Sequence, residues 1–171
     1  MSNDSKGKQA DVHTLSAYVA NKPGVLARVA QVFARKGFNI DSLVVSPGSE
    51  EHFSRMTLTV VGHTSDLVQI IRQVNRLVDV LHCIDHTQQD CVIKELALIK
   101  VHFLPETRTE LFQVAEHFKA QTVDLTERSL ILMVTGGSDK LDALIALLAK
   151  FEIVELVRTG KVIMVRGKAM T

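Results

Sequence analysis

Residues 21–41 have the sequence NKPGVLARVAQVFARKGFNID, and the rest of the chain is organised around them. Pro23 suits the first turn of a helix, because the N–H that proline lacks would be unpaired there. The apolar residues of a helical stripe follow, and they are Leu26, Val29, Ala30 and Phe33. Gly37 can adopt the left-handed conformation that ends a helix, and Phe38 can then pack back on the last turn. The stretch therefore predicts a turn, an amphipathic helix, a glycine stop and a new strand.

The beginning of this helix predicts a binding site for a carboxylate group. A helix N-terminus presents unpaired backbone N–H groups and the positive end of the helix dipole. Gly24 has no side chain that would block an approaching anion. A helix N-terminus alone is weak evidence, because every helix has one. A plain strand-to-helix connection therefore remains the alternative at this point.

The first half of the chain has the predicted order βαββαβ. Strand periodicity is found over residues 14–19, 39–45, 53–61 and 78–84. A second helical stripe comprises Leu67, Ile70, Ile71, Val74 and Leu77. Thr64 or Ser65 is available as the N-cap of that helix. In this order two helices cover one face of a four-stranded antiparallel sheet, the ferredoxin-like arrangement, and its uncovered strand edges favour side-by-side dimerisation.

The second half repeats this plan. Strands are predicted over residues 93–101, 122–125, 130–135 and 153–157, with 161–165 as an additional one. Thr107 and Glu110 have the spacing of a capping box. The segments VVGHTSDL and VTGGSDKL can be aligned, which indicates two related domains. The prediction is an α+β protein with a disordered tail over residues 1–11 and domains over residues 12–89 and 90–171.

Specific motifs resemble a known family. The patterns N-x-P-G-V-L-A-R-V-A, starting at Asn21, and F-x-x-x-G-F-N-I-D-S-L, starting at Phe33, resemble the ACT domain, a regulatory module that binds small molecules. The segments SRMTLTVVG, from Ser54, and LVDVL, from Leu77, resemble the regulatory (small) subunit of acetohydroxyacid synthase, also called acetolactate synthase. The resemblance is dense over residues 12–104 and looser beyond. It implies that the first ferredoxin-like domain is an ACT domain.

The resemblance also implies a binding site for valine. The expected effector-binding residues are Asn21, Gly24, Val25, Leu26, Asn39 and Ile40. Backbone N–H groups of the turn would hold the carboxylate, the two asparagine side chains would accept from the ammonium, and the leucine and isoleucine would line an aliphatic pocket. In ACT domains the ligand typically lies between two copies, so Asn39 and Ile40 are expected from the neighbouring chain of a homodimer.

The function that the resemblance implies is regulatory. The chain would bind the catalytic (large) subunit of acetohydroxyacid synthase, raise its activity and confer feedback inhibition by valine. Thiamine diphosphate, Mg²⁺ and FAD would belong to that partner, and no cofactor is expected in this chain. The alternative is a stand-alone amino-acid sensor without an enzyme partner.

Composition and missing motifs narrow the remaining classes. Twenty basic and nineteen acidic residues give a net charge of +1, and no basic stripe favours nucleic acid. No apolar run reaches the roughly 20 residues that span a bilayer. Residues 1–11 lack the apolar segment of a signal peptide, and two cysteines do not form a disulfide framework, so a cytoplasmic location is expected. No nucleophile motif, paired carboxylates or metal-ligand spacing appears, so neither catalytic nor metal-binding residues are expected.

Overall fold

The computed structural model describes residues 11–168, 170 and 171, which form two compact units. Unit 1 comprises the described residues up to Val92 together with those from Ile163 onward, and unit 2 comprises Ile93–Val162. The predicted disordered tail lies outside the described residues, except for Asp11, which begins the first strand.

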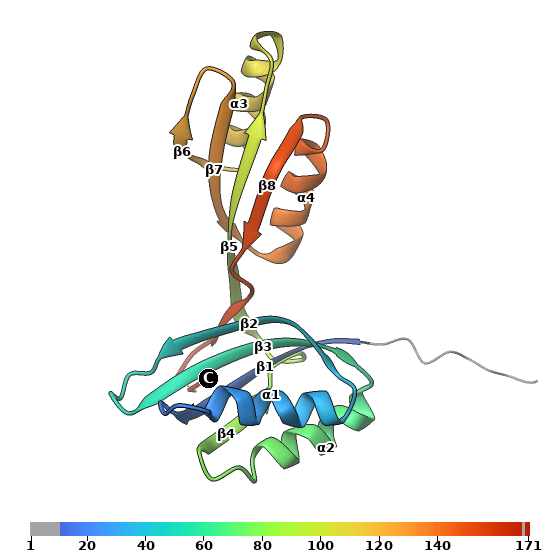
Figure 1. Ribbon diagram of the computed structural model, residues 1–171, viewed down its shortest axis with the longest axis vertical. Coiled ribbons are helices and arrows are strands. Elements are labelled where there is room, and N and C mark those ends of the chain that lie inside the picture. The colour runs from blue at the N-terminus through green and yellow to red at the C-terminus, as the bar shows by residue number, and fades with distance from the viewer. Residues whose placement is uncertain (1–10, 169) are drawn as a thin grey trace, which may run out of the picture. The chain divides into compact units, whose positions relative to one another are not determined.

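Unit 1 has the predicted order βαββαβ (Figure 1). Its elements are β1 (Asp11–Ala20), α1 (Val25–Arg35), β2 (Asn39–Pro47), β3 (Phe53–Gly62), α2 (Thr64–Val74) and β4 (Val80–Asp85). The strand order is β2-β3-β1-β4, and every pairing is antiparallel. Both helices cover the same face of the sheet (Figure 1). This is the ferredoxin-like arrangement, and β2 and β4 are its edge strands.

Unit 2 repeats the arrangement. Its elements are β5 (Cys91–His102), the 3₁₀ turn η1 (Pro105–Thr107), α3 (Arg108–His117), β6 (Gln121–Leu125), β7 (Ser129–Gly136), α4 (Ser138–Leu148) and β8 (Glu152–Arg158). The strand order β6-β7-β5-β8 is that of unit 1, and β9 (Val162–Val165) pairs with β5. The predicted α+β class with two ferredoxin-like units is confirmed.

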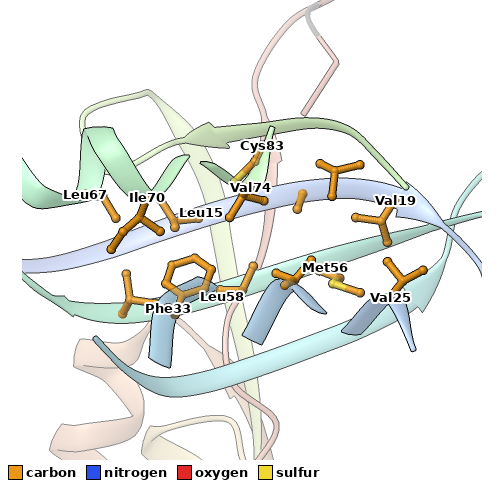
Figure 2. Packing of buried hydrophobic residues seen from close by; sticks show 14 residues of the cluster. Leu15, Val19, Val25, Phe33, Met56, Leu58, Leu67, Ile70, Val74 and Cys83 are labelled. Carbon is orange, nitrogen blue, oxygen red and sulfur yellow. The ribbon is translucent and has the colours of Figure 1, made fainter. Parts of the chain in front are cut away.

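The core of unit 1 lies between the sheet and its two helices (Figure 2). Alternate residues of the central strands, such as Leu15 and Leu58, meet the buried stripe of each helix. In α1 this stripe is Val25, Val29 and Phe33. Leu26 was predicted in the stripe, but its side chain is 42% exposed. The buried stripe follows an i, i+4, i+8 row that starts at Val25, the first residue of the helix, and this row leaves Leu26 at its edge.

The end of α1 confirms the glycine stop. Gly37 has φ 71°, and its N–H donates to the carbonyl of Ala34 at 3.0 Å. The N–H of Phe38 donates to the carbonyl of Phe33 at 3.1 Å. These two bonds are those of a Schellman motif. Phe38 packs against the core, and β2 begins at the next residue.

The predicted capping bonds do not form at α2 and α3, although Thr107 is the N-cap residue of α3. His63 is the N-cap of α2, and its side chain makes no capping bond. Before α3 the hydroxyl of Thr107 accepts from the N–H of Leu104 at 3.2 Å and donates to its carbonyl at 3.1 Å. That local turn occupies the hydroxyl, so the expected capping box with Glu110 does not form. Short polar side chains bond nearby backbone in either arrangement, and the sequence alone does not distinguish them.

The polar face of the unit 1 sheet is also covered. Ser16 lies on it and is 1% exposed. Its hydroxyl lies 2.7 Å from Nε2 of the buried His86, which follows β4.

Arg55 of β3 donates to the carbonyl of Thr171 at 3.2 Å, across 116 residues of sequence. The units therefore differ from the predicted domains 12–89 and 90–171, because the last residues return to unit 1.

Candidate effector site

A type II β-turn over residues 22–25, the glycine turn, precedes α1. Gly24 has φ 83° and ψ −9°, the angles of the third residue of such a turn, and proline is common at the second position, where Pro23 lies. The N–H of Val25 lies 3.4 Å from the carbonyl of Lys22 and closes the turn. Pro23 is therefore outside the helix rather than in its first turn, and a positive φ makes glycine the preferred residue at position 24.

The turn leaves donors free at the beginning of α1. The N–H of Arg28 makes the first helical bond, to the carbonyl of Gly24 at 3.1 Å. Within the described chain, the N–H groups of Leu26 and Ala27 have no acceptor. The N–H of Val25 is engaged in the long bond that closes the turn. Of the donors that the sequence indicated, the N–H of Val25 is engaged whereas that of Leu26 is free in the described chain, and the N–H of Ala27 is a further free donor.

Arg28 adds a cation that the sequence analysis did not assign to the site. A Cβ atom at Gly24 would lie 3.4 Å from Nη1 of Arg28. The same guanidinium forms an ion pair with Asp79, which precedes β4. A guanidinium has five N–H donors, so this pair leaves donors for a second anion. The signal was the spacing of four residues between Gly24 and Arg28, which places both on one side of a helix.

Four of the six predicted site residues, Gly24 among them, lie at this corner of unit 1. The N–H of Asn21 donates to the carbonyl of His52 at 2.8 Å, which ties the turn to the β2–β3 hairpin, and the Asn21 side chain is exposed. Leu26 exposes its apolar side chain next to Gly24. Val25 is 2% exposed, so only its backbone can take part.

The other two predicted residues lie at the opposite end of unit 1. Asn39 pairs with Val61 of β3, whereas the turn follows Ala20, which pairs with Phe53. The 11 residues of α1 separate the two groups by about 16 Å. Asn39 donates to Oδ1 of Asp41 at 2.6 Å, and Ile40 packs against the core. One chain therefore does not bring all six predicted residues together.

Three buried side chains of unit 1, those of Ser16, Cys83 and His86, are structural. His86 links Ser16 to Gln89, whose Oε1 lies 2.8 Å from Nδ1 of the imidazole. Both Ser16 and His86 are sealed from solvent, so the hydroxyl is not an accessible nucleophile. Burial, with a smaller contribution from the carboxylate of Asp85, raises the pKa of the Cys83 thiol to about 12. Such a thiol stays protonated and behaves as a small apolar residue.

The described residues contain neither a cluster of metal-ligating side chains nor a helix that could cross a membrane. No group of three metal-ligating side chains is assembled there. No helix among those residues is long and apolar enough to cross a membrane.

The ferredoxin-like fold and the glycine turn define the class, an ACT-domain protein. Residues 15–82 match the family model of the AHAS small subunit-like ACT domain, and residues 94–167 match that of the small subunit of acetolactate synthase. The chain belongs to the acetolactate synthase small subunit family. The resemblance inferred from the sequence motifs is confirmed, and membership supports a regulatory rather than a catalytic role.

Individual relatives agree with the family models. A probable acetolactate synthase small subunit of Archaeoglobus fulgidus is 46% identical over 155 residues, which cover 91% of this chain and 97% of the relative. The acetolactate synthase small subunit of Mycolicibacterium smegmatis is 41% identical over 155 residues, 91% of each chain. The crystal structure of the acetolactate synthase small subunit from Thermotoga maritima has a TM-score of 0.84 and 37% identity, and the match covers 93% of this chain and 99% of that one.

Proposed function

We propose that this chain binds the catalytic subunit of acetohydroxyacid synthase, raises its activity and makes the holoenzyme sensitive to valine. Family membership supports the enzyme partner, and the glycine turn supports the effector. Thiamine diphosphate, Mg²⁺ and FAD belong to the catalytic subunit in this proposal. The complex would act in the cytoplasm.

Valine fits the chemistry of the turn. Its carboxylate would accept from the N–H groups of Leu26 and Ala27 and from the guanidinium of Arg28, where the helix dipole also favours an anion. Its ammonium would donate to the side-chain oxygens of Asn21 and Asn39. Its isopropyl group would lie against the exposed Leu26 and the half-buried Ile40.

The observation that carries a two-chain site is the separation of these groups. β2 is an edge strand, so it can pair with β2 of a second copy. The Pro47 end of β2 lies at the same end of the sheet as the glycine turn, and the Asn39 end lies opposite. Antiparallel pairing about a twofold axis therefore places Asn39 and Ile40 of each chain beside the glycine turn of its partner. The homodimer completes two sites that each chain alone leaves divided.

Inhibition requires that valine bind one arrangement of the holoenzyme better than another, because a ligand shifts an equilibrium only through differential affinity. A site shared between two chains meets this condition, since any change in the dimer interface changes the distance between its two halves. Valine would then stabilise the interface geometry in which the catalytic subunit is less active.

Reconstitution with the catalytic subunit tests the function. The chain alone should form no acetolactate from pyruvate, whereas its addition to the catalytic subunit should raise the rate, and valine should reverse that gain. Pull-down of the catalytic subunit from a lysate provides independent evidence of the complex. If valine binds but an authentic catalytic subunit is neither captured nor stimulated, the chain is a stand-alone amino-acid sensor.

Mixing two defective variants tests the shared site. Gly24→Asp impairs the turn half of each site, and Asn39→Ala impairs the β2 half. A mixed dimer has one site with both defects and one intact site, so calorimetric titration should recover valine binding at about one site per mixed dimer. A site built within one chain would give no recovery on mixing.

A further inference from the structure

Unit 2 has a cavity at the corner that corresponds to the glycine turn of unit 1. In unit 1 the residue after the first strand, Asn21, donates its N–H to the carbonyl of His52, which precedes the third strand. In unit 2 the residue after the first strand, Phe103, donates its N–H to the carbonyl of Arg128, which also precedes the third strand, at 3.0 Å. The same bond joins the same elements, so the two corners are equivalent.

The cavity at this corner has an apolar floor. Its volume is about 510 Å³, within the range of roughly 300–1,000 Å³ typical of small-molecule sites. Phe103 and Phe151 are almost fully buried beneath it, and Leu104 exposes its side chain beside them. Phe151 precedes the last strand of unit 2, as Asp79 does in unit 1. The equivalent position has therefore changed from a carboxylate to a phenyl ring.

The rim of the cavity carries an arginine that no carboxylate pairs with in the described part of the chain. Nδ1 of His102 lies 3.4 Å from Oε2 of Glu152, and Lys150 forms an ion pair with Glu110. Among the residues that the structure describes, the guanidinium of Arg128 has no carboxylate partner. The rim thus offers an arginine whose charge is not neutralised.

Hydrogen bonds to the backbone of Arg128 fix its position in the turn and do not involve its side chain. The hydroxyl of Thr126 accepts from the N–H of Ser129 at 3.0 Å and from that of Arg128 at 3.4 Å. The carbonyl of Arg128 accepts from Phe103 in the bond described above. The turn that carries Arg128 is therefore already ordered, so binding of an anion has to order only the arginine side chain.

We propose that this corner of unit 2 is a second ligand site, for a small carboxylate that carries a hydrocarbon group. The carboxylate binds Arg128, and the hydrocarbon group packs on Phe103 and Phe151. The carboxylate is the charged group that the proposal assigns to the ligand, because Arg128 is the lining cation that no carboxylate pairs with among the described residues. The site is separate from the glycine turn, and its ligand differs in charge from an amino acid.

Titration of the full chain with 4-methylpentanoate tests this proposal. Backbone ¹H–¹⁵N resonances of Phe103, Arg128 and Phe151 should shift on binding. The neutral 4-methylpentanamide should bind about tenfold more weakly or worse, because it lacks the charge of the acid. Valine, titrated separately, reports on the glycine turn, so failure of this site and failure of the proposed effector site give different results.

Arg128→Gln should weaken 4-methylpentanoate binding about tenfold or more and remove the preference for the acid over the amide. Arg108→Gln is the matched control, because Arg108 is stacked on Phe112 in the same unit and does not line the cavity. Spectral dispersion shows whether each variant is folded. No shifts, shifts confined to the glycine turn, equal affinity for acid and amide, or equal effects of the two substitutions would each overturn the proposal.

Discussion

Replacing Gly24 by aspartate or by asparagine distinguishes the effect of a negative charge on valine binding from the effect of backbone strain, because the two residues have the same size and only aspartate is charged. The positive φ of 83° costs an ordinary L-residue about 1–2 kcal/mol, and Asn and Asp tolerate this region best. A new Cβ would meet only Nη1 of Arg28, the end of a flexible side chain, at 3.4 Å. Both variants should therefore fold, with a loss near 1 kcal/mol. For a domain of this size that lowers Tm by about 4–8 °C.

The two variants differ in valine binding. The aspartate carboxylate lies where the ligand carboxylate would lie, within reach of Arg28 and of the N–H groups of Leu26 and Ala27. Loss of one charge-assisted hydrogen bond costs about 1.5–3 kcal/mol, which is roughly ten- to a hundredfold in affinity. Asparagine has the same size without the charge, so Gly24→Asn should lose less affinity than Gly24→Asp.

Calorimetric titration with valine measures the difference, and thermal unfolding of each variant measures the strain. Gly24→Asp should still stimulate the catalytic subunit while resisting valine. Equal valine affinities of the two folded variants would refute an ionic contact at this turn. Unchanged affinity in both would move the effector site elsewhere.

The remaining predictions concern packing and stability. Gly62→Ala should destabilise unit 1 by about 1–3 kcal/mol in urea unfolding, because the new Cβ would lie 2.0 Å from the ring of Phe38, whereas Gly137→Ala meets no atom and should be neutral. The raised pKa of Cys83 means that its folded form favours the neutral thiol, so its stabilising contribution is complete below about pH 9 and is lost as pH rises toward 12. Cys83→Ala should lack this alkaline loss when unfolding is compared at about pH 8 and about pH 11. Deletion of residues 163–171 should increase amide exchange in β3 of unit 1, and in β5 where it pairs with β9, but not in β6 and β7 of unit 2. The reverse pattern would contradict the assignment of this segment.

Local periodicity was sufficient to predict the elements and their order. The alternation around Leu15 places apolar side chains on one face of a strand. The helical row that ends at Phe33 places them on one face of a helix. Both faces leave water only when the helix packs on the sheet, so the two patterns together predict a shared core. The glycine stop at Gly37 was predictable for the same reason, because it depends on neighbouring residues. The separation of Asn39 from the glycine turn also follows from strand order and helix length.

Contacts between distant residues could not be predicted in this way. Arg55 and Thr171 are 116 residues apart, and nothing in either local sequence indicates their hydrogen bond. The conformation of Gly24 had a local signal, since a Pro-Gly pair favours a type II turn, but a helical first turn was equally compatible with Pro23. The wrong capping box at Thr107 has the same origin, because its hydroxyl had two nearby backbone partners.

The return of the C-terminal residues makes unit 2 an insertion within unit 1. The chain leaves unit 1 after Val92 and re-enters it at Ile163, on β5 and β9, which pair with each other. A stop codon placed after the first unit would therefore remove part of that unit along with the second. An isolated regulatory module is better obtained by excising residues 93–162 and closing the two paired strands with a short hairpin turn. Circular permutants that begin within unit 2 should likewise keep unit 1 covalently whole.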